Sequence, residues 1–228
     1  MRSNGNHPLI IPKNVWALGI VSLLMDLSYE MILSILPIFL VTGLGVSVLT
    51  LGLIEGLAEG VASVIKAFSG ALSDYLKKRK ILVVIGYGLS TLTKPFFALA
   101  STATWIFAAR FVDRLGKGIR VAPRDSLIAD STSTKIRGTA YSLRQTLDTL
   151  GAVLGPIFAI IILYLTTNNF RLVLWFAVIP AVLCIVVLIF GVKESTLKKN
   201  IYFVNQLKND SLKNLVGPPG FEPGTNTL

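Results

Sequence analysis

Six long apolar runs constrain this chain more than any other feature of its sequence. The hydrocarbon core of a bilayer is about 30 Å thick and needs a helix of roughly 20 residues to cross it. Short polar or glycine-rich breaks separate the runs, which are Val15–Val41, Leu49–Leu76, Ile81–Ala100, Thr102–Ile128, Ala140–Leu165 and Leu172–Val192. The sequence therefore predicts an all-α integral membrane protein with six transmembrane helices.

The composition agrees with a membrane protein. Hydrophobic residues make up 53% of the 228 residues and charged residues only 15%, whereas about a quarter of the residues in a soluble domain are charged. The net charge of +10 would suggest nucleic acid in a soluble protein. Much of this charge, however, lies in short segments beside the apolar runs, where it directs membrane topology. We therefore expect a lipid bilayer as partner and no nucleic acid.

Basic residues alternate between successive breaks and so predict the orientation of the chain. Short cytoplasmic loops are rich in Lys and Arg. Basic residues precede the first run and follow the second, fourth and sixth, while the opposite breaks carry only Arg171. Both termini are expected in the cytoplasm. We divide the chain into a cytoplasmic N-terminus (1–14), a six-helix membrane body (15–192) and a cytoplasmic linker with an unstructured, Pro- and Gly-rich tail (193–228).

Charged side chains inside the runs are the main functional candidates, since each costs at least ~2.5 kcal/mol at the bilayer centre. Lys66 and Lys94 stand alone. Other charges occur four residues apart, which places each pair on one helix face; these pairs are Asp26 with Glu30, Glu55 with Glu59, and Arg144 with Asp148. On one side of the fourth run lie Arg110, Asp113, Arg114, Lys117, Arg120 and Arg124.

Two interpretations of these charges remain open. They either form salt-bridge networks that join helices, or they line a water-accessible path whose carboxylates take up and release protons or bind a cation. So much charge favours the second interpretation for the set as a whole. Arg110 and Arg114 are suited to holding an anion or a carboxylate, because guanidinium stays charged. The candidates for proton coupling are Asp26, Glu30, Glu55 and Glu59.

The break after the second run reads Gly70-Ala-Leu-Ser-Asp-Tyr-Leu-Lys-Lys-Arg-Lys80. It resembles the loop signature of the major facilitator superfamily, with a glycine, an aspartate and a basic cluster. In that family the loop is a conformational latch near the inner gate. Tyr75 and Lys77 depart from the pattern, which commonly has a basic residue and a glycine at these positions. The resemblance implies a gating role for Gly70, Asp74, Lys78 and Arg79.

Two further segments are similar to elements of the same family. Arg110, Gly116 and Asp130 match its fourth-helix motif, in which the arginine is associated with proton coupling, although Arg114 replaces the usual first glycine. The fifth run resembles the Gly-x-x-x-Gly-Pro element of antiporters through Gly151, Gly155 and Pro156. Small residues four apart also let any two membrane helices pack closely. The additional charges resemble a bacterial branch of the family, which implies the bacterial inner membrane.

Members of this family consist of two six-helix halves with the substrate site between them. The resemblance therefore implies an N-terminal half, whose partner is a missing C-terminal half or a second copy of the chain. Gly220-Phe-Glu-Pro223 reads like the antisense translation of a transfer RNA T-arm. This tail favours loss of a second half.

The implied function is transport of a small solute by a proton-coupled secondary transporter, and the antiporter-like motif points to efflux. The alternatives are a truncated or vestigial membrane fragment without transport activity, and a homo-oligomeric channel. We expect no enzyme activity and no cofactor, because the sequence shows no phosphate-binding loop and no nucleophile with a nearby base. His7 and Cys184 are the only residues of their types, so no metal site is expected.

Overall fold

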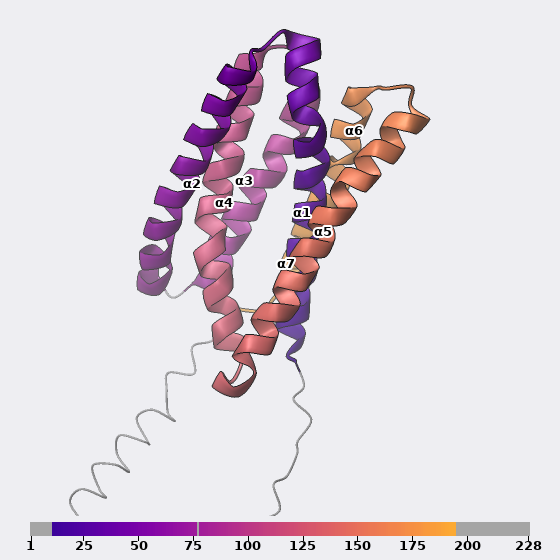
Figure 1. The fold of residues 1–228 in the computed structure, drawn as a ribbon. Helices are drawn as coiled ribbons and strands as arrows, with labels where there is room; N and C mark the ends of the chain where they lie inside the picture. The colour runs from indigo at the N-terminus through magenta and orange to yellow at the C-terminus, as the bar shows by residue number, and fades with distance from the viewer. Residues whose placement is uncertain (1–10, 77, 195–228) are drawn as a thin grey trace, which may run out of the picture. The chain divides into compact units, whose positions relative to one another are not determined.

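The computed structural model describes residues 11–76 and 78–194, and these residues form helices without any strand (Figure 1). A π-helical turn, Phe39–Gly43, continues α1, and a short 3-10 turn, Thr134–Ile136, precedes α5. The helices are α1 (Lys13–Ile38), α2 (Val48–Leu76), α3 (Arg79–Leu99), α4 (Ala103–Ser131), α5 (Arg137–Leu165), α6 (Phe170–Phe176) and α7 (Val178–Gly191). The six predicted runs correspond to these units within a few residues, which confirms the all-α membrane fold. Most of the predicted N-terminal segment (1–14) and of the predicted linker and tail (193–228) lies outside the described residues, as does Lys77.

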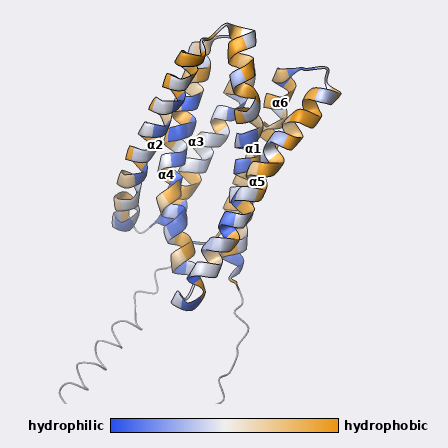
Figure 2. Cartoon of the chain, viewed as in Figure 1, coloured by the Kyte–Doolittle hydropathy of each residue, from blue (hydrophilic) through white to orange (hydrophobic). Residues whose placement is uncertain are grey.

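Within residues 11–76 and 78–194, five helical units are long and apolar enough to cross a membrane, counting α6 and α7 as one. The exception is α4, which has the length of α2, 29 residues, but carries many charges. Its neighbours explain how such a helix is accommodated, since α4 packs against α2 and α3 and also contacts α1 and α5. Figure 2 shows hydrophilic residues along α4 and hydrophobic residues over much of the other helices.

The sixth run is interrupted, which differs from the single helix expected over Leu172–Val192. Ala177 separates α6 from α7. Pro180 has no N–H to donate to the carbonyl four residues earlier, and this loss weakens the helix at the break. Ser28 of α1 donates a hydrogen bond of 2.6 Å to the carbonyl oxygen of Ala177. The break therefore contributes to the attachment of this unit to α1.

Buried apolar side chains form two separate clusters. One lies where α1, α3 and α5 end and α4 and α6 begin, and includes Ile35, Phe97 and Ile106. The other lies at the opposite ends of the helices and includes Leu18 and Leu127. Most charged residues of α1, α4 and α5 fall between these two clusters along their helices, and the exceptions, Lys13, Asp130 and Arg137, lie near the helix ends. The bundle therefore has a polar middle layer between two apolar layers.

Backbone contact joins α5 to α1. A Cβ atom added to Gly155 would lie 2.6 Å from the Cβ of Glu30, and one added to Gly151 would collide with the carbonyl oxygen of Leu23. Both contacts would be far closer than a normal van der Waals contact, so larger residues at positions 151 and 155 would force α1 and α5 apart. The small residues of the antiporter-like motif therefore act here as packing residues.

Candidate functional site

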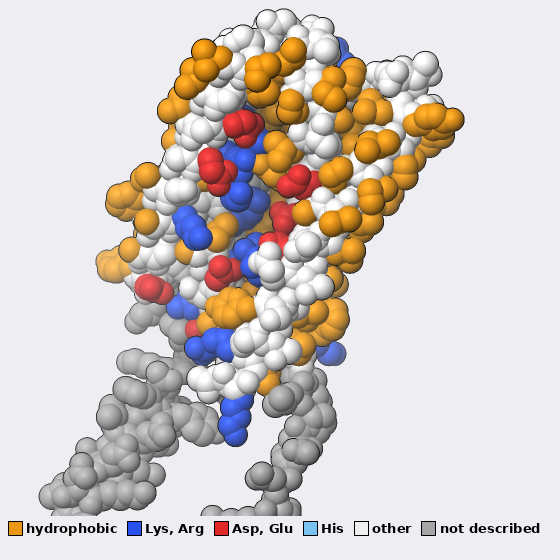
Figure 3. Space-filling model, viewed as in Figure 1, with side chains coloured by type: hydrophobic (Ala, Val, Ile, Leu, Met, Phe, Trp, Pro, Cys, Tyr) orange, Lys and Arg blue, Asp and Glu red, His pale blue; other side chains and the backbone are white. Residues whose placement is uncertain are grey.

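A polar cavity of about 180 Å³ lies between α1, α4 and α5. Its lining brings together three carboxylates from α1 and α5 and three basic side chains from α4. Figure 3 shows acidic and basic side chains gathered in a band on this face of the bundle. The lining residues are Asp26, Tyr29, Glu30, Lys117, Arg120, Val121, Arg124 and Asp148. The predicted candidates Asp26, Glu30 and Asp148 thus share one site.

Ion pairs hold α2 against α4. Glu55 accepts two hydrogen bonds of 2.7 Å from Arg110, one from Nε and one from a terminal nitrogen, so the pair is bidentate. Glu59 pairs with Arg114 at 2.8 Å and with Lys117 at 3.6 Å. Such forked arginine–carboxylate pairs combine charge with fixed geometry. The two carboxylates of α2 therefore lie in a paired network beside the cavity, and this supports the structural interpretation for them.

Tyr29 connects α1 to the same network. Its hydroxyl oxygen accepts hydrogen bonds from Arg110, at 2.9 Å, and from Arg114. The ring centroid lies 4.9 and 5.0 Å from the guanidinium carbons of these two arginines, within the range of cation–π attraction. Lys94 and Lys117 approach the ring to 5.5 and 5.8 Å. The sequence did not single out Tyr29, since no sequence signal marks a ring among four cations.

Lys94 and Asp113 form a buried ion pair between α3 and α4, so the prediction that Lys94 stands alone is wrong. The Nζ to Oδ1 distance is 3.0 Å, and the two side chains are only 1% and 3% exposed. Asp113 therefore belongs to the α3 contact and does not line the cavity. The charged side of α4 is wide enough to meet three helices, and residues three or four apart on it reach different neighbours.

The carboxylates of the cavity differ in their partners. Asp148 pairs with Arg144 of its own helix at 3.1 Å, and the carboxyl group of Asp26 lies close enough to that of Asp148 to interact with it. In residues 11–76 and 78–194, no basic group lies within 4.0 Å of Asp26 or Glu30. The α1 carboxylates are therefore the unpaired acids of the site.

The predicted gating loop is tied to the end of α4. Arg79 pairs with Asp74 at 3.1 Å and with Asp130, and donates a 2.9 Å hydrogen bond to the carbonyl oxygen of Ser126. Gly70 lies opposite Ala122, where an added Cβ would make an ordinary contact of 3.6 Å. Lys78, the residue before α3, is exposed. Arg79 thus bonds to α4 directly, Gly70 faces it, and, in the part of the chain that the structure describes, Asp74 is linked to it only through Arg79.

Two residues at the same end of the bundle were missed by sequence reasoning. Glu194 accepts hydrogen bonds from the backbone N–H groups of Arg79, at 3.0 Å, and Lys80, at 2.9 Å, and so caps the first turn of α3. Asn14 bonds to both backbone groups of Lys193 and to Ser131. These partners are more than 100 residues apart in sequence, and no spacing rule connects them. The contacts place residues 14 and 193 at one end, as six alternating spans require.

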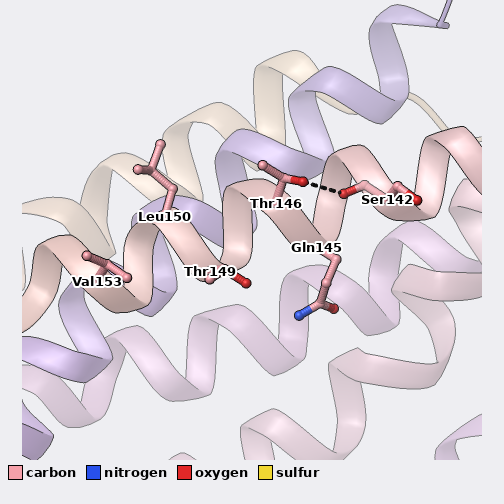
Figure 4. A pocket seen from close by; sticks show the side chains of 6 residues that line it. All are labelled: Ser142, Gln145, Thr146, Thr149, Leu150 and Val153. Carbon is pink, nitrogen blue, oxygen red and sulfur yellow. Dashed lines mark hydrogen bonds between the residues drawn. The ribbon is translucent and has the colours of Figure 1, made fainter.

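The outer surfaces of α2 and α5 each carry an open hollow. The hollow on α5 has a volume of about 620 Å³ and is lined by that helix alone (Figure 4). Its polar residues include Gln145 and Thr149, and Thr146 bonds to the carbonyl oxygen of Ser142. The hollow on α2 has a volume of about 380 Å³ and includes Gly56. These helices are also the least buried of the five apolar units.

Comparison with known proteins relates this geometry to transporters. An uncharacterised MFS-type transporter of Methanocaldococcus jannaschii is 36% identical over 212 residues, which are 92% of this chain and 52% of that protein. The multidrug resistance protein MdtH of Photorhabdus laumondii is 30% identical over 68% of this chain and 37% of that protein. The chain therefore spans about half of the first relative and less of the second.

Solved structures show the same fold. The structure of a POT family transporter in complex with 5-aminolevulinic acid matches with a TM-score of 0.71 and 16% identity, over 90% of this chain and 45% of that one. A sequence model described as Major Facilitator Superfamily matches residues 18–217. With most of its length inside this match, the chain belongs to the Major Facilitator Superfamily.

Proposed function

We propose that the chain is one six-helix half of a secondary transporter that moves a small solute along its polar cavity by coupling to protons. The observation that carries this proposal is the absence of ion pairing at Asp26 and Glu30. Both line the cavity, and neither has a basic partner within 4.0 Å in the described part of the chain. Ion pairing between helices accounts for the presence of Glu55 and Glu59 inside the membrane but not for that of Asp26 and Glu30.

Asp26 and Asp148 form the proposed proton site. Two carboxylates at close range repel each other when both are ionised, so such a pair favours sharing one proton. Glu30 lies one turn along α1 on the same cavity wall. In this proposal Arg110 does not bind the proton-carrying carboxylates directly, because its N–H donors are already bonded to Glu55 and Tyr29. Its role is to fix α2 and α1 around α4.

The proposed gate is the contact between Asp74, Arg79 and Asp130. Gates of this kind work by breaking and remaking contacts between rigid helices. Arg79, the first residue of α3, joins Asp74 near the end of α2 to Asp130 near the end of α4, so its release would free α2 and α3 to move relative to α4. We place this end in the cytoplasm, in line with the basic residues around it, and the protein in the bacterial inner membrane.

The uncovered faces of α2 and α5 support a second six-helix body as partner. Substrate sites in transporters with internal repeats lie between the two halves, and this chain spans about half of its first relative. A C-terminal half or a second copy of the chain would cover both hollows. Efflux is the proposed direction, supported by the likeness to a multidrug resistance protein and by the Gly151-x-x-x-Gly155-Pro156 element.

Vesicle transport tests this proposal. The 228-residue chain, alone and fused to the C-terminal half of the Methanocaldococcus relative, would be reconstituted and given a pH gradient. We expect solute movement driven by the gradient, lost in Asp26→Asn and Glu30→Gln. Glu194→Gln is the matched control, because Glu194 lies outside the cavity lining and a glutamine keeps an oxygen acceptor for the N–H groups of Arg79 and Lys80. Absence of coupled movement in both forms would favour the alternative of a membrane fragment without transport activity.

A further inference from the structure

We propose that Arg120 is the anchor for a carboxylate group of the transported solute. The proposal rests on the proposed function, because it names the class of solute that the polar cavity accepts. It assigns to the cavity a binding residue that is not one of the matched residues Arg110, Gly116 and Asp130 of the fourth-helix motif and that takes no part in the ion-pair network on α2.

Arg120 is the unpaired base of the cavity. Its neighbours in the lining have acidic partners, since Lys117 lies 3.6 Å from Glu59 and Arg124 lies 3.2 Å from Asp125. Arg120 is only 6% exposed, yet no carboxylate of the described residues lies within 4.0 Å of it. Asp26 and Asp113 interact with this guanidinium only from beyond ion-pair distance, so part of the cost of burying it remains uncompensated. A bound anion would remove this cost, so the site is suited to one.

The side chain of Arg120 is held in place by α3. One terminal nitrogen donates a hydrogen bond to the hydroxyl oxygen of Ser90, which itself donates to the carbonyl oxygen of Asp113. The guanidinium carbon lies 4.5 Å from the ring centroid of Tyr87. Only glycine fits at position 86, where an added Cβ would lie 2.6 Å from the Cβ of Arg120. These contacts fix a planar group at the cavity wall before any ligand arrives.

The geometry of guanidinium favours a carboxylate as ligand. Five N–H donors in a fixed fork can bind both oxygens of a carboxylate at once. Ser90 uses one of these donors, and the group lines the cavity. A volume of about 180 Å³ limits the bound part to a small molecule or to the acidic end of a larger one.

The carboxylates across the cavity link anion binding to protons. When ionised, Asp26 and Glu30 repel an anion at Arg120, so protonation of either strengthens anion binding, and anion binding in turn favours protonation. Proton and anion then cross together, so an inward proton gradient drives uptake of such an anion, and its efflux follows an outward gradient of the anion itself. The other ionisable groups around the guanidinium come from every neighbouring helix. They are Tyr29 of α1, Lys94 and Tyr87 of α3, Asp113, Lys117 and Arg124 of α4, Asp148 of α5, which pairs with Arg144, and Cys184 of α7. Glu59 of α2 acts through Lys117.

Equilibrium dialysis of the purified full chain in detergent micelles tests the proposal with probes of matched size. Benzoate carries a carboxylate, benzylamine carries an ammonium group, and benzyl alcohol is neutral. We expect benzoate to bind more tightly than the other two, and more tightly at about pH 6 than at about pH 8, where fewer carboxyl groups carry a proton. Arg120→Gln should weaken benzoate binding by about tenfold or more, in line with loss of a charge-assisted pair.

Matched variants separate anchoring from folding. Arg171→Gln removes an exposed arginine at the start of α6 and should leave benzoate binding unchanged. Arg120→Lys keeps the charge without the fork, so we expect binding between the wild type and Arg120→Gln. If Arg120→Gln fails to fold, Ser90→Ala provides the second test and should weaken benzoate binding severalfold, because it removes the acceptor that positions Arg120.

Two results would overturn the proposal: benzoate binding that is unchanged in Arg120→Gln or in Ser90→Ala, or preferred binding of benzylamine. Either would leave proton-coupled transport intact, with solutes of another charge. Conversely, benzoate binding that depends on Arg120, in a chain whose fused form shows no gradient-driven transport, would support the anion site and contradict the proposed function. The two failures are therefore distinguishable.

Discussion

Two outer helices, α2 and α5, are attached to the bundle in different ways. Between α2 and α4 the attachment is ionic, through Glu55 and Glu59 to the basic residues of α4. Between α5 and α1 it is backbone contact at Gly151 and Gly155. Close backbone packing does not need charges to hold the helices together. The carboxylates of α1 are therefore left without ion-pair partners, and these are the groups to which we assign function.

The largest expected effect concerns the ionic side of this comparison. Glu55→Ala leaves Arg110, which is 1% exposed, without its counter-ion, and we expect a loss of about 3–5 kcal/mol in the free energy of unfolding. The matched change Glu30→Ala removes an unpaired carboxylate and should cost much less. Unfolding in mixed detergent micelles measures both. Equal losses of unfolding free energy in the two variants would contradict the distinction between a paired carboxylate on α2 and an unpaired carboxylate on α1.

Tyr29→Phe tests the link that Tyr29 makes between α1 and the ion-pair network of α2 and α4. The variant keeps the ring, and with it the cation–π contacts, but removes the oxygen that accepts from Arg110 and Arg114. A hydrogen bond to a charged group contributes about 1.5–3 kcal/mol, and the two bonds that share this oxygen are not additive, so a loss in that range is expected in the same unfolding measurement. A loss that persists unchanged in the Arg114→Gln background would show that Tyr29 and Arg114 are not coupled.

Gly155→Val tests the backbone contact of α5 with α1. The added Cβ would lie 2.6 Å from the Cβ of Glu30, and overpacking of this kind costs about 1–3 kcal/mol. Gly138→Ala, also in α5, is the control, because an added Cβ there meets nothing within 4 Å. The unfolding free energies of the two variants check this. Full stability of Gly155→Val would mean that close backbone approach does not hold α5.

The smallest effect is expected at the cap of α3. Glu194→Ala removes the acceptor for the N–H groups of Arg79 and Lys80. Caps of this type contribute about 1 kcal/mol, and hydrogen exchange at these two amides is the direct measurement. Unchanged exchange would show that Glu194 does not cap the helix in the membrane.

The sequence predicts the spans well because hydropathy and length decide them locally. Alternation of basic residues matches the geometry, since Asn14 and Lys193 meet at one end. The break at Ala177 was missed because Pro180 lies inside an otherwise uniform apolar run. The candidate site was predicted only in part. Spacing places Asp26 and Glu30 on one face, but the rotation of neighbouring helices decides that Glu55 is paired and that Asp26 is not.

Infrared spectroscopy of the carboxyl C=O stretch tests the central claim most directly. A protonated carboxyl group absorbs where an ionised one does not, so a pH titration of the chain in lipid follows proton uptake. We predict a protonated-carboxyl band that changes with pH while the protein stays folded, disappears in Asp26→Asn, and persists in Glu55→Gln. A band that persists in Asp26→Asn and disappears in Glu55→Gln would place the exchanging proton in the paired network and contradict the account.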